Sequence, residues 1–511
     1  MDAAPIFEEP REAAAADRRG ADPLWIALAV TALVTVLRLF DTVDIDVAWQ
    51  LWIAGRLHAG AHLYRDIVEV NPPLWFWMAV PVDAATRAIG ARPDAVLVLF
   101  MGGIVALSLS AVNRLLTDIA PGRRALLLGY AALMLMAMPW VHVGQREQIV
   151  LIGTLPYAAL VAARTEGRRV PMALAVLIGA GAALGFALKH YFLIVPLVLE
   201  LGLVAQRPRE WRLLRPEIGA IAIVGALYAL AIAVFARDYL TNMVPLIRIA
   251  YGIVGAPSLS QVFGLFALLG LGILAFVAAH WRLLARAPLT SALVVAGAGF
   301  ALVYFIQSKG WLYHAIPLVG CASLALAALL AETTEPPRML RILSPALLAL
   351  PLLFAAQERL HPAEPSAELV NAISGLEAGD SVGFLAVDNA IPWSVTLQHR
   401  FRYPSRYMAF WMLNAIVINE RSGGHDARLV KLGRQIVSET VEDFRCVPPK
   451  TLIVARPGPG ERGFDILAFF LRDPAFAELM SHYKARPWAG FERYDLVSPL
   501  SPPQSPCRAG I

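Results

Sequence analysis

The chain has 511 residues, of which 58% are hydrophobic and only 16% are charged. Soluble domains are about a quarter charged, so this composition excludes an ordinary soluble protein and indicates that most of the chain faces lipid or other helices. The formal net charge of +5 is carried by arginines in short loops, without a lysine- or arginine-rich run or an RNA-binding signature. The charge therefore reports membrane topology, and we expect no nucleic-acid partner.

Apolar runs of helical length recur along the first 356 residues. Backbone groups in hydrocarbon must be hydrogen-bonded internally, so each run is predicted to be a transmembrane helix. The first run is predicted to be a signal anchor that is not cleaved. The predicted segments are 24–40, 94–113, 124–141, 147–163, 170–188, 191–206, 217–236, 259–280, 288–306, 315–331 and 339–356.

Arginine clusters predict the orientation of these segments. Under the positive-inside rule the clusters belong in the cytoplasm, together with the tail 1–23. The rule is satisfied throughout if residues 73–90, which contain Pro81, Asp83 and Arg87, form a juxtamembrane helix and do not cross the bilayer. The clusters are Arg11/Arg18/Arg19, Arg114/Arg123/Arg124, Arg164/Arg168/Arg169, Arg207/Arg209/Arg212/Arg215, Arg282/Arg286 and Arg338/Arg341.

After residue 356 the long apolar runs stop, and charge, proline and glycine increase. Residues 357–511 are predicted to form a small soluble α/β domain on the outer, periplasmic side. "SVGFLAV" and "TLIVA" are typical of short strands, and "FDILAFFLRDPAFAELMSHY" is typical of a helix. Two of the three cysteines, Cys446 and Cys507, lie in this region and could pair in an oxidising compartment, whereas Cys321 lies in an apolar segment.

The predicted outer loops contain the side chains that could carry chemistry. A partly desolvated carboxylate at the membrane boundary can accept a proton from a hydroxyl group near neutral pH. The first 356 residues contain only two lysines, Lys189 and Lys309, and both fall in outer loops, where they could hold a phosphate. The other candidates are Asp41, Asp44, Asp46, Asp66, Glu69, Arg146, Glu147, His190, Tyr313 and His314.

Four short motifs occur in a fixed order between about residues 24 and 335. They are "DVAWQLWIAGRLHAG" followed by "NPPLW", then "GQREQIV", "GFALKHYFLIVP" and "SKGWLYHAIP". In this order and spacing the chain resembles the GT-C superfamily of integral membrane glycosyltransferases, in particular its protein O-mannosyltransferase and aminoarabinose-transferase branch. The pattern departs from the family at three points: Val47 follows Asp46 where an acidic residue is usual, Asn71 replaces Lys or His, and His190 replaces Gly.

The resemblance implies an all-α polytopic fold of about 11–13 transmembrane helices, with juxtamembrane helices in the first outer loop, 41–72. It implies a bacterial inner-membrane enzyme, with residues 24–356 as its catalytic domain. Such an enzyme would transfer a sugar, with inversion, from a polyprenyl-phosphate donor to a glycan, lipid or protein hydroxyl group. No cofactor is expected, although a divalent cation between the acidic loops would be compatible with the family.

By the same resemblance the site residues take distinct roles. Asp46 is the expected base, with Asp44 supporting or replacing it, and Glu147 is the second acidic residue. Lys189, Lys309 and Arg146 would hold the donor phosphate, although Arg146 with Glu147 could instead orient the acceptor. The remaining expected lining residues are Glu69, Asn71, His190, Tyr313 and His314.

Structural interpretations remain open for several of these residues. Glu147 could sit in the first turn of a helix because the helix dipole favours an acid there. Lys189 and Lys309 could extend from helix ends to lipid headgroups, and Tyr313 could belong to the aromatic belt. A transporter or flippase is the main alternative function, but it would need charges near mid-bilayer and a repeated architecture. A polysaccharide polymerase or ligase is the other alternative.

Overall fold

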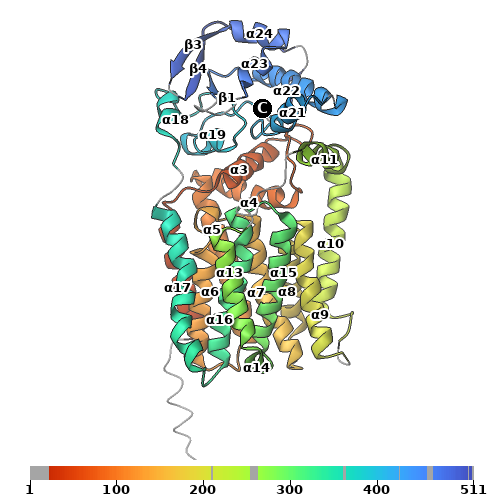
Figure 1. The fold of residues 1–511 in the computed structure, drawn as a ribbon, viewed down its shortest axis with the longest axis vertical. Helices are drawn as coiled ribbons and strands as arrows, with labels where there is room; N and C mark the ends of the chain where they lie inside the picture. Colours follow the sequence, from red (N-terminus) through yellow and green to blue (C-terminus); the bar gives the residue numbers. More distant parts are fainter. Residues whose placement is uncertain are drawn as a thin grey trace, which may run out of the picture.

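The computed structural model describes residues 22–208, 211–253, 263–360, 364–424, 426–456, 464–488, 490–503 and 506–508. Almost all of the predicted tail 1–23 lies outside these residues. A long bundle of helices carries a smaller α/β domain at one end, which we call the upper end (Figure 1). The architecture agrees with the all-α membrane fold plus C-terminal α/β domain expected from the sequence.

The bundle helices match the predicted apolar segments one by one. Six of the described helices are both long and apolar enough to cross a membrane: α5, α7, α10, α15, α16 with the short turn before it, and α17. Four others, α2, α8, α9 and α13, are shorter apolar helices, and α6 is a further short helix of 16 residues. The bounds are α2 Pro23–Arg38, α5 Pro93–Leu115, α6 Pro121–Met136, α7 Arg146–Thr165, α8 Met172–Phe186, α9 Ile194–Gln206, α10 Pro216–Phe235, α13 Leu265–Ala279, α15 Pro288–Gln307, α16 Ile316–Glu332 and α17 Arg338–Leu360.

Two helices lie at the upper end of the bundle: α3 Ile45–His58, within the loop 41–72, and α4 Leu74–Ile89, directly after this loop (Figure 1). They pack together, and Gln50 Nε2 donates to the carbonyl of Trp75 at 2.6 Å. The helix α4 lies in the stretch that was predicted to be juxtamembrane. The loop 237–258 contains a helix that the sequence did not predict, α11 Val244–Ile253. The short helix α14 Trp281–Leu284 lies at the lower end of the bundle (Figure 1).

The C-terminal domain is built on a four-stranded sheet in the order β1-β2-β4-β3. The predicted strands are confirmed as β1 Val382–Leu385 and β2 Thr451–Ala455, which pair in parallel with Val382 opposite Thr451. β3 Tyr483–Trp488 and β4 Phe491–Leu496 form an unpredicted hairpin. The helices of the C-terminal domain are α18 Ala367–Ala372, α19 Ala390–Trp393, α20 Thr396–His399, α21 Leu413–Arg421, α22 Ala427–Cys446, α23 Ile466–Phe470 and α24 Pro474–Ser481.

The stretch "FDILAFFLRDPAFAELMSHY" is helical as predicted, but it forms two helices with a break that was not predicted, because α23 ends at Phe470 and α24 begins at Pro474. Asp473 caps the second helix by accepting from the backbone N–H of Ala475. A proline at the first helical position after an Asp cap starts a new helix and cannot continue the previous one.

Aromatic side chains join the C-terminal domain to the bundle. Trp49 and Trp52 of α3 pack against Trp393 at ring-centroid distances of 4.8 and 5.7 Å, and Trp52 also contacts Tyr403. Such contacts bury a large apolar area in a fixed geometry. The domain is therefore docked on the helix that carries the candidate base.

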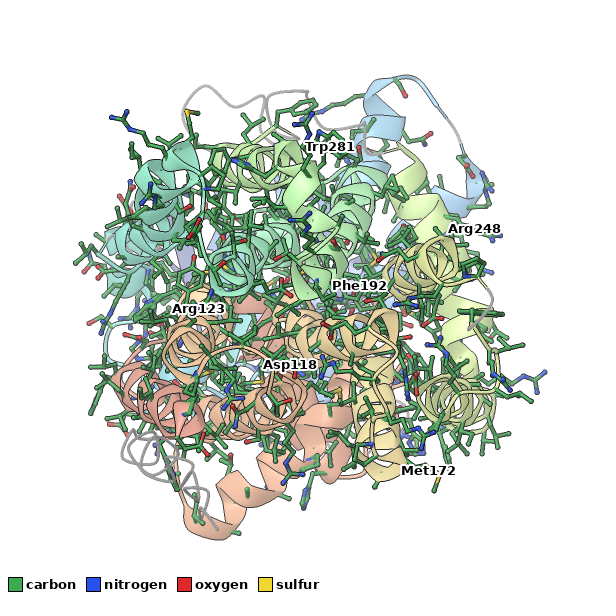
Figure 2. The ribbon with its side chains drawn as sticks, turned by 90° about the horizontal axis from the view of Figure 1, so that it is seen from below. Asp118, Arg123, Met172, Phe192, Arg248 and Trp281 are labelled. Atoms are coloured by element: carbon green, nitrogen blue, oxygen red, sulfur yellow. A yellow bond between two sulfur atoms is a disulfide. The ribbon has the colours of Figure 1, made fainter. Side chains whose placement is uncertain are left out.

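Figure 2 views the bundle from below, with the helices end-on. Asp118, labelled there, lies between α5 and α6, and Arg123, also labelled, lies in the first turn of α6. Arg168 donates to the carbonyl of Leu115 at 2.7 Å and pairs with Asp118 at 3.3 Å. Arg168, which follows α7, is thereby tied to the connection between α5 and α6.

Candidate active site

The candidate base stands at the start of α3, and the local sequence explains its position. Asp44 is the N-cap of this helix and accepts from the backbone N–H of Asp46 at 2.8 Å, as is usual for a capping aspartate. The backbone N–H of Asp44 donates to the carbonyl of Val141 at 2.8 Å. The start of α3 is therefore fixed against the turn that leads into α7. This contact brings the motif that begins at Asp46 next to the motif "GQREQIV".

That turn depends on Gly144, which has φ +84°. A β-carbon there would lie 2.7 Å from Leu97 Cδ2, so both the backbone conformation and the close packing favour glycine. The turn places Gln145 so that its amide donates to Asp44 at 3.0 Å and to Asp46 at 3.3 Å. Sequence reasoning missed Gln145, whose side-chain amide joins the two carboxylates.

The two aspartates have different environments. Asp46 accepts from the Tyr313 hydroxyl at 3.1 Å and lines a cavity of about 510 Å³, whereas Asp44 is not among the residues that line it. Burial and then the neighbouring Asp44 raise the pKa of Asp46. Burial acts in the same direction on Asp44, but His142 at 2.9 Å, the backbone N–H of Asp46 and the Gln145 amide together outweigh burial, so the pKa of Asp44 lies below its ordinary value. Asp46 is the better proton acceptor near neutral pH.

The cations expected to hold phosphate line the same cavity. Arg146 lies at the N-terminus of α7, Lys189 lies between α8 and α9, and Lys309 follows α15. The Lys189 ammonium donates to Glu147 at 2.5 Å and to Gln307 at 2.9 Å. Burial lowers the pKa of Lys189 to about 8, against the opposing charge of Glu147, and burial also lowers the pKa of Lys309.

Glu147 takes a different place from the one expected for a second acidic residue facing substrate. Its side chain is fully buried, lies in the first turn of α7 and is the counter-ion of Lys189. It is not among the lining residues of the cavity. Glu147 was expected either as an acid in the first turn of a helix or as the second acidic residue of the site. The geometry contains part of each, because Glu147 lies at the start of α7 and also positions the Lys189 cation.

The remaining expected residues surround this cavity. The Glu69 carboxylate is buried and accepts from Trp49 at 2.6 Å and from the backbone and side chain of Asn71 at 2.7 Å. Burial raises the pKa of Glu69 despite these donors. Asn71 in turn accepts from Arg146, whose guanidinium lies 4.5 Å from the Trp75 ring centroid. His190, Tyr313 and His314 also line the cavity, and His314 Nε2 lies 3.2 Å from the Lys189 ammonium.

The C-terminal domain supplies one wall of the cavity, which the sequence did not predict in detail. Residues 406–412, which we call the roof segment, contribute Tyr407, Met408, Trp411 and Met412. The segment is joined to the first outer loop because Val68 N–H donates to the carbonyl of Arg406 at 2.9 Å. The mixed aromatic and basic character of "HRFRYPSRYMAFW" was its only signal in the sequence.

The cavity does not favour a metal ion. Within the residues that the structure describes, no group of three His, Cys, Asp or Glu side chains is placed to hold one. Glu147 is paired with Lys189, and Glu69 is surrounded by the donors of Trp49 and Asn71. Both carboxylates are thus engaged through at least one oxygen, and the cavity itself is lined by three cations, Arg146, Lys189 and Lys309. The donor set therefore fits an anion better than a divalent cation.

The site thus combines a buried carboxylate with a cluster of cations, beneath the C-terminal domain and at one end of a long helical bundle. The fold that carries this site is similar to known structures. The chain has the fold of the GT-C class of integral membrane glycosyltransferases. A crystal structure of ArnT from Cupriavidus metallidurans bound to undecaprenyl phosphate matches with a TM-score of 0.53 and 12% identity, over 94% of this chain and 98% of that one.

A second solved structure is similar over a comparable stretch. It is the archaeal oligosaccharyltransferase AglB from Archaeoglobus fulgidus, in complex with an inhibitory peptide and a dolichol-phosphate. It matches with a TM-score of 0.44 and 12% identity, over 93% of this chain and 74% of that one. No protein-family model and no curated protein matches the sequence.

Proposed function

We propose that this protein is a membrane glycosyltransferase that moves a sugar from a polyprenyl-phosphate donor to a hydroxyl group, with inversion, at the outer face of a bacterial inner membrane. The observation that carries the proposal is that Asp46 and the cations Arg146, Lys189 and Lys309 line one cavity at the upper end of the bundle. The fold similarity to ArnT, whose structure contains undecaprenyl phosphate, supports the choice of donor.

The chemistry follows from these positions. The acceptor hydroxyl group attacks the anomeric carbon from the face opposite the phosphate, and its proton moves to the carboxylate of Asp46. The bond from that carbon to the phosphate oxygen breaks, and its electron pair leaves with the polyprenyl phosphate. The cations stabilise this charge in the partly desolvated cavity. Phosphate is already a good leaving group, so no general acid is assigned.

The supporting residues complete the assignment. Asp44 keeps its charge and raises the proton affinity of Asp46, while Glu147 and His314 position the Lys189 ammonium. Tyr313 orients the Asp46 carboxylate. In this proposal residues 24–356 form the catalytic domain, residues 357–511 lie in the periplasm, and the tail 1–23 lies in the cytoplasm. The location of the charged cavity at one end of the bundle favours an outer-leaflet enzyme over a transporter.

The proposal is tested by Asp46→Asn in a strain where loss of the gene changes a surface glycan. We expect the variant protein to accumulate normally and the glycan to be lost. The matched control is Asp41→Asn, because Asp41 belongs to the same loop but pairs with Arg359 at 3.5 Å and does not line the cavity. Normal glycan in cells carrying Asp46→Asn would overturn the proposal.

A further inference from the structure

A second cavity, of about 430 Å³, adjoins the candidate active site beneath the C-terminal domain. It lies between the first outer loop, residues 242–246 at the start of α11, and α22. Its lining residues are Tyr64, Arg65, Val68, Asn242, Met243, Leu246, Tyr407, Leu432, Gln435, Glu439 and Arg508. Its volume lies within the range of about 300–1,000 Å³ that is typical of ligand pockets.

The two cavities share a wall. Val68 and Tyr407 line both of them, and these residues are paired in a short parallel bridge. Tyr64 lines the second cavity and packs at a ring-centroid distance of 5.1 Å against Tyr239, which lines the first. A ligand in the second cavity would therefore lie one side chain away from the reaction site.

The chemistry of the second cavity is suited to an uncharged polar ligand. Its lining includes Tyr64 and Tyr407, which are only 3% and 2% exposed, and the exposed amides of Asn242 and Gln435. The Gln435 amide donates to Glu439 at 3.1 Å and the Asn242 amide to Asp238 at 3.4 Å, which leaves their carbonyl oxygens and second N–H groups for the hydrogen bonds that sugar hydroxyl groups require.

Each charged residue of this cavity already faces an opposite charge. Arg65 pairs with Asp66 at 3.5 Å and Arg508 with Glu442 at 3.7 Å. Glu439 accepts from the Tyr407 hydroxyl at 2.5 Å and lies 3.5 Å from Arg406. Because each of these charges faces an opposite charge within 4 Å, the cavity favours an uncharged ligand over an ionic one.

The rim of this cavity is held by the disulfide. Cys507 is bonded to Cys446 at the end of α22. The next residue, Arg508, donates to the carbonyl of Arg65 in the first outer loop. The bond therefore ties the C-terminal tail across one side of the second cavity and connects α22 with the loop.

We infer that the second cavity is the acceptor subsite and that the acceptor is a neutral saccharide. This inference rests on the proposed glycosyl transfer. The saccharide would lie against Tyr64 and Tyr407 and extend one hydroxyl group past Val68 towards Asp46. The C-terminal domain would thus select the acceptor, while the bundle binds the donor.

The test uses membranes that contain the full-length protein, the native lipid-linked sugar donor, and an envelope extract of the deletion strain as the source of unmodified acceptor. Asn242→Ala/Gln435→Ala should raise the KM for this extract about tenfold, the effect of losing two hydrogen bonds, with kcat unchanged. Gln435→Trp, at an exposed helix position, should raise the KM further by filling the mouth. Gln398→Ala, at an exposed position on α20 outside this cavity, should change nothing.

The possible failures are separable. If the wild-type protein transfers sugar but both cavity variants have the KM of Gln398→Ala, the subsite is overturned while the transferase function stands. If excess extract fails to restore the rate of the cavity variants, they affect catalysis and the subsite is also overturned. If the wild-type protein transfers no sugar from any lipid-linked donor, the proposed function fails.

Discussion

At the scale of single residues, the site depends on pairs of charges in which one member alone faces the cavity. Lys189 lines the cavity and Glu147 lies behind it, 2.5 Å away and fully buried. Asp46 lines the cavity and Asp44 lies behind it, with His142 and Gln145 as its partners. In both cases the hidden residue sets the position or the proton affinity of the exposed one.

This arrangement predicts how Lys189 variants behave. Lys189→Gln leaves the Glu147 carboxylate buried without its cation, and removing one partner of a buried pair typically costs about 3–5 kcal/mol. We expect a clear loss of thermal stability in detergent. Lys189→Gln/Glu147→Gln should recover most of that stability but not donor binding. Equal stability of the single and double variants would contradict the pairing.

The pH dependence of transfer follows from the same groups. Asp46 acts as base only when deprotonated, and its pKa is raised, so the rate should fall on acidification at a pH above the ordinary aspartate value of about 4. Lys189 holds phosphate only when protonated, and its pKa of about 8 predicts a second decline above that pH. Rate measurements from pH 4 to 10 test this, and Lys189→Arg should move the alkaline limb upward. A rate that is flat across this range would contradict both assignments.

At the scale of elements, helix contacts set which substitutions the bundle tolerates. A β-carbon on Gly179 of α8 would lie 2.5 Å from the carbonyl oxygen of Glu217 in α10. Gly181, two residues along the same helix, has nothing within 4 Å of that position. The contact explains why a small residue is needed at one position and not at the other.

We therefore expect Gly179→Ala to destabilise the bundle by about 1–3 kcal/mol, the usual cost of overpacking. Gly181→Ala should be neutral or slightly stabilising, because alanine favours a helix more than glycine does. Thermal unfolding of the two variants in the same detergent measures the difference. A Gly179→Ala variant as stable as Gly181→Ala would show that α8 and α10 do not pack this closely.

The elements also show what the sequence could and could not predict. Apolar runs predicted the bundle helices because lipid forces long, internally bonded segments. Strand β3, "YKARPW", was missed because it is mostly exposed and contains Pro487, so it lacks the alternation of a half-buried strand. The helix α11 was missed because its ten residues lie in a predicted loop and are too short for a crossing.

The residues of the candidate site could likewise be predicted only in part from the sequence. Asp46, Lys189, Lys309 and Tyr313 could be singled out because charged and polar residues at the ends of apolar segments are unusual and recur in spaced motifs. Gln145 and His142 have no such signal, since their role depends on a turn made possible by Gly144. The roof segment could not be assigned because its position results from the docking of Trp393 on α3, a contact between distant parts of the chain.

At the scale of the whole molecule, the Cys446–Cys507 disulfide gives a way to test the proposed periplasmic location of the C-terminal domain. Such bonds persist in oxidising compartments and are rare in the cytosol. We expect denatured, unreduced protein from intact cells to react with maleimide at Cys321 alone, and reduced protein to react at all three cysteines. Three reactive thiols before reduction would place the domain in the cytoplasm and contradict the proposed topology.

The proton acceptor Asp46 and the phosphate anchor Lys189 are proposed to act in one cavity. A single paired measurement tests this joint assignment. Binding of undecaprenyl phosphate and transfer of sugar would be measured on the same purified protein. Asp46→Asn should bind the lipid phosphate like the wild type yet transfer sugar about 10²–10⁴-fold more slowly, the range expected for a lost general base. The Lys189→Gln/Glu147→Gln variant should bind it weakly. Wild-type transfer by Asp46→Asn would contradict its role as the base, and wild-type binding by Lys189→Gln/Glu147→Gln would contradict the role of Lys189 as phosphate anchor.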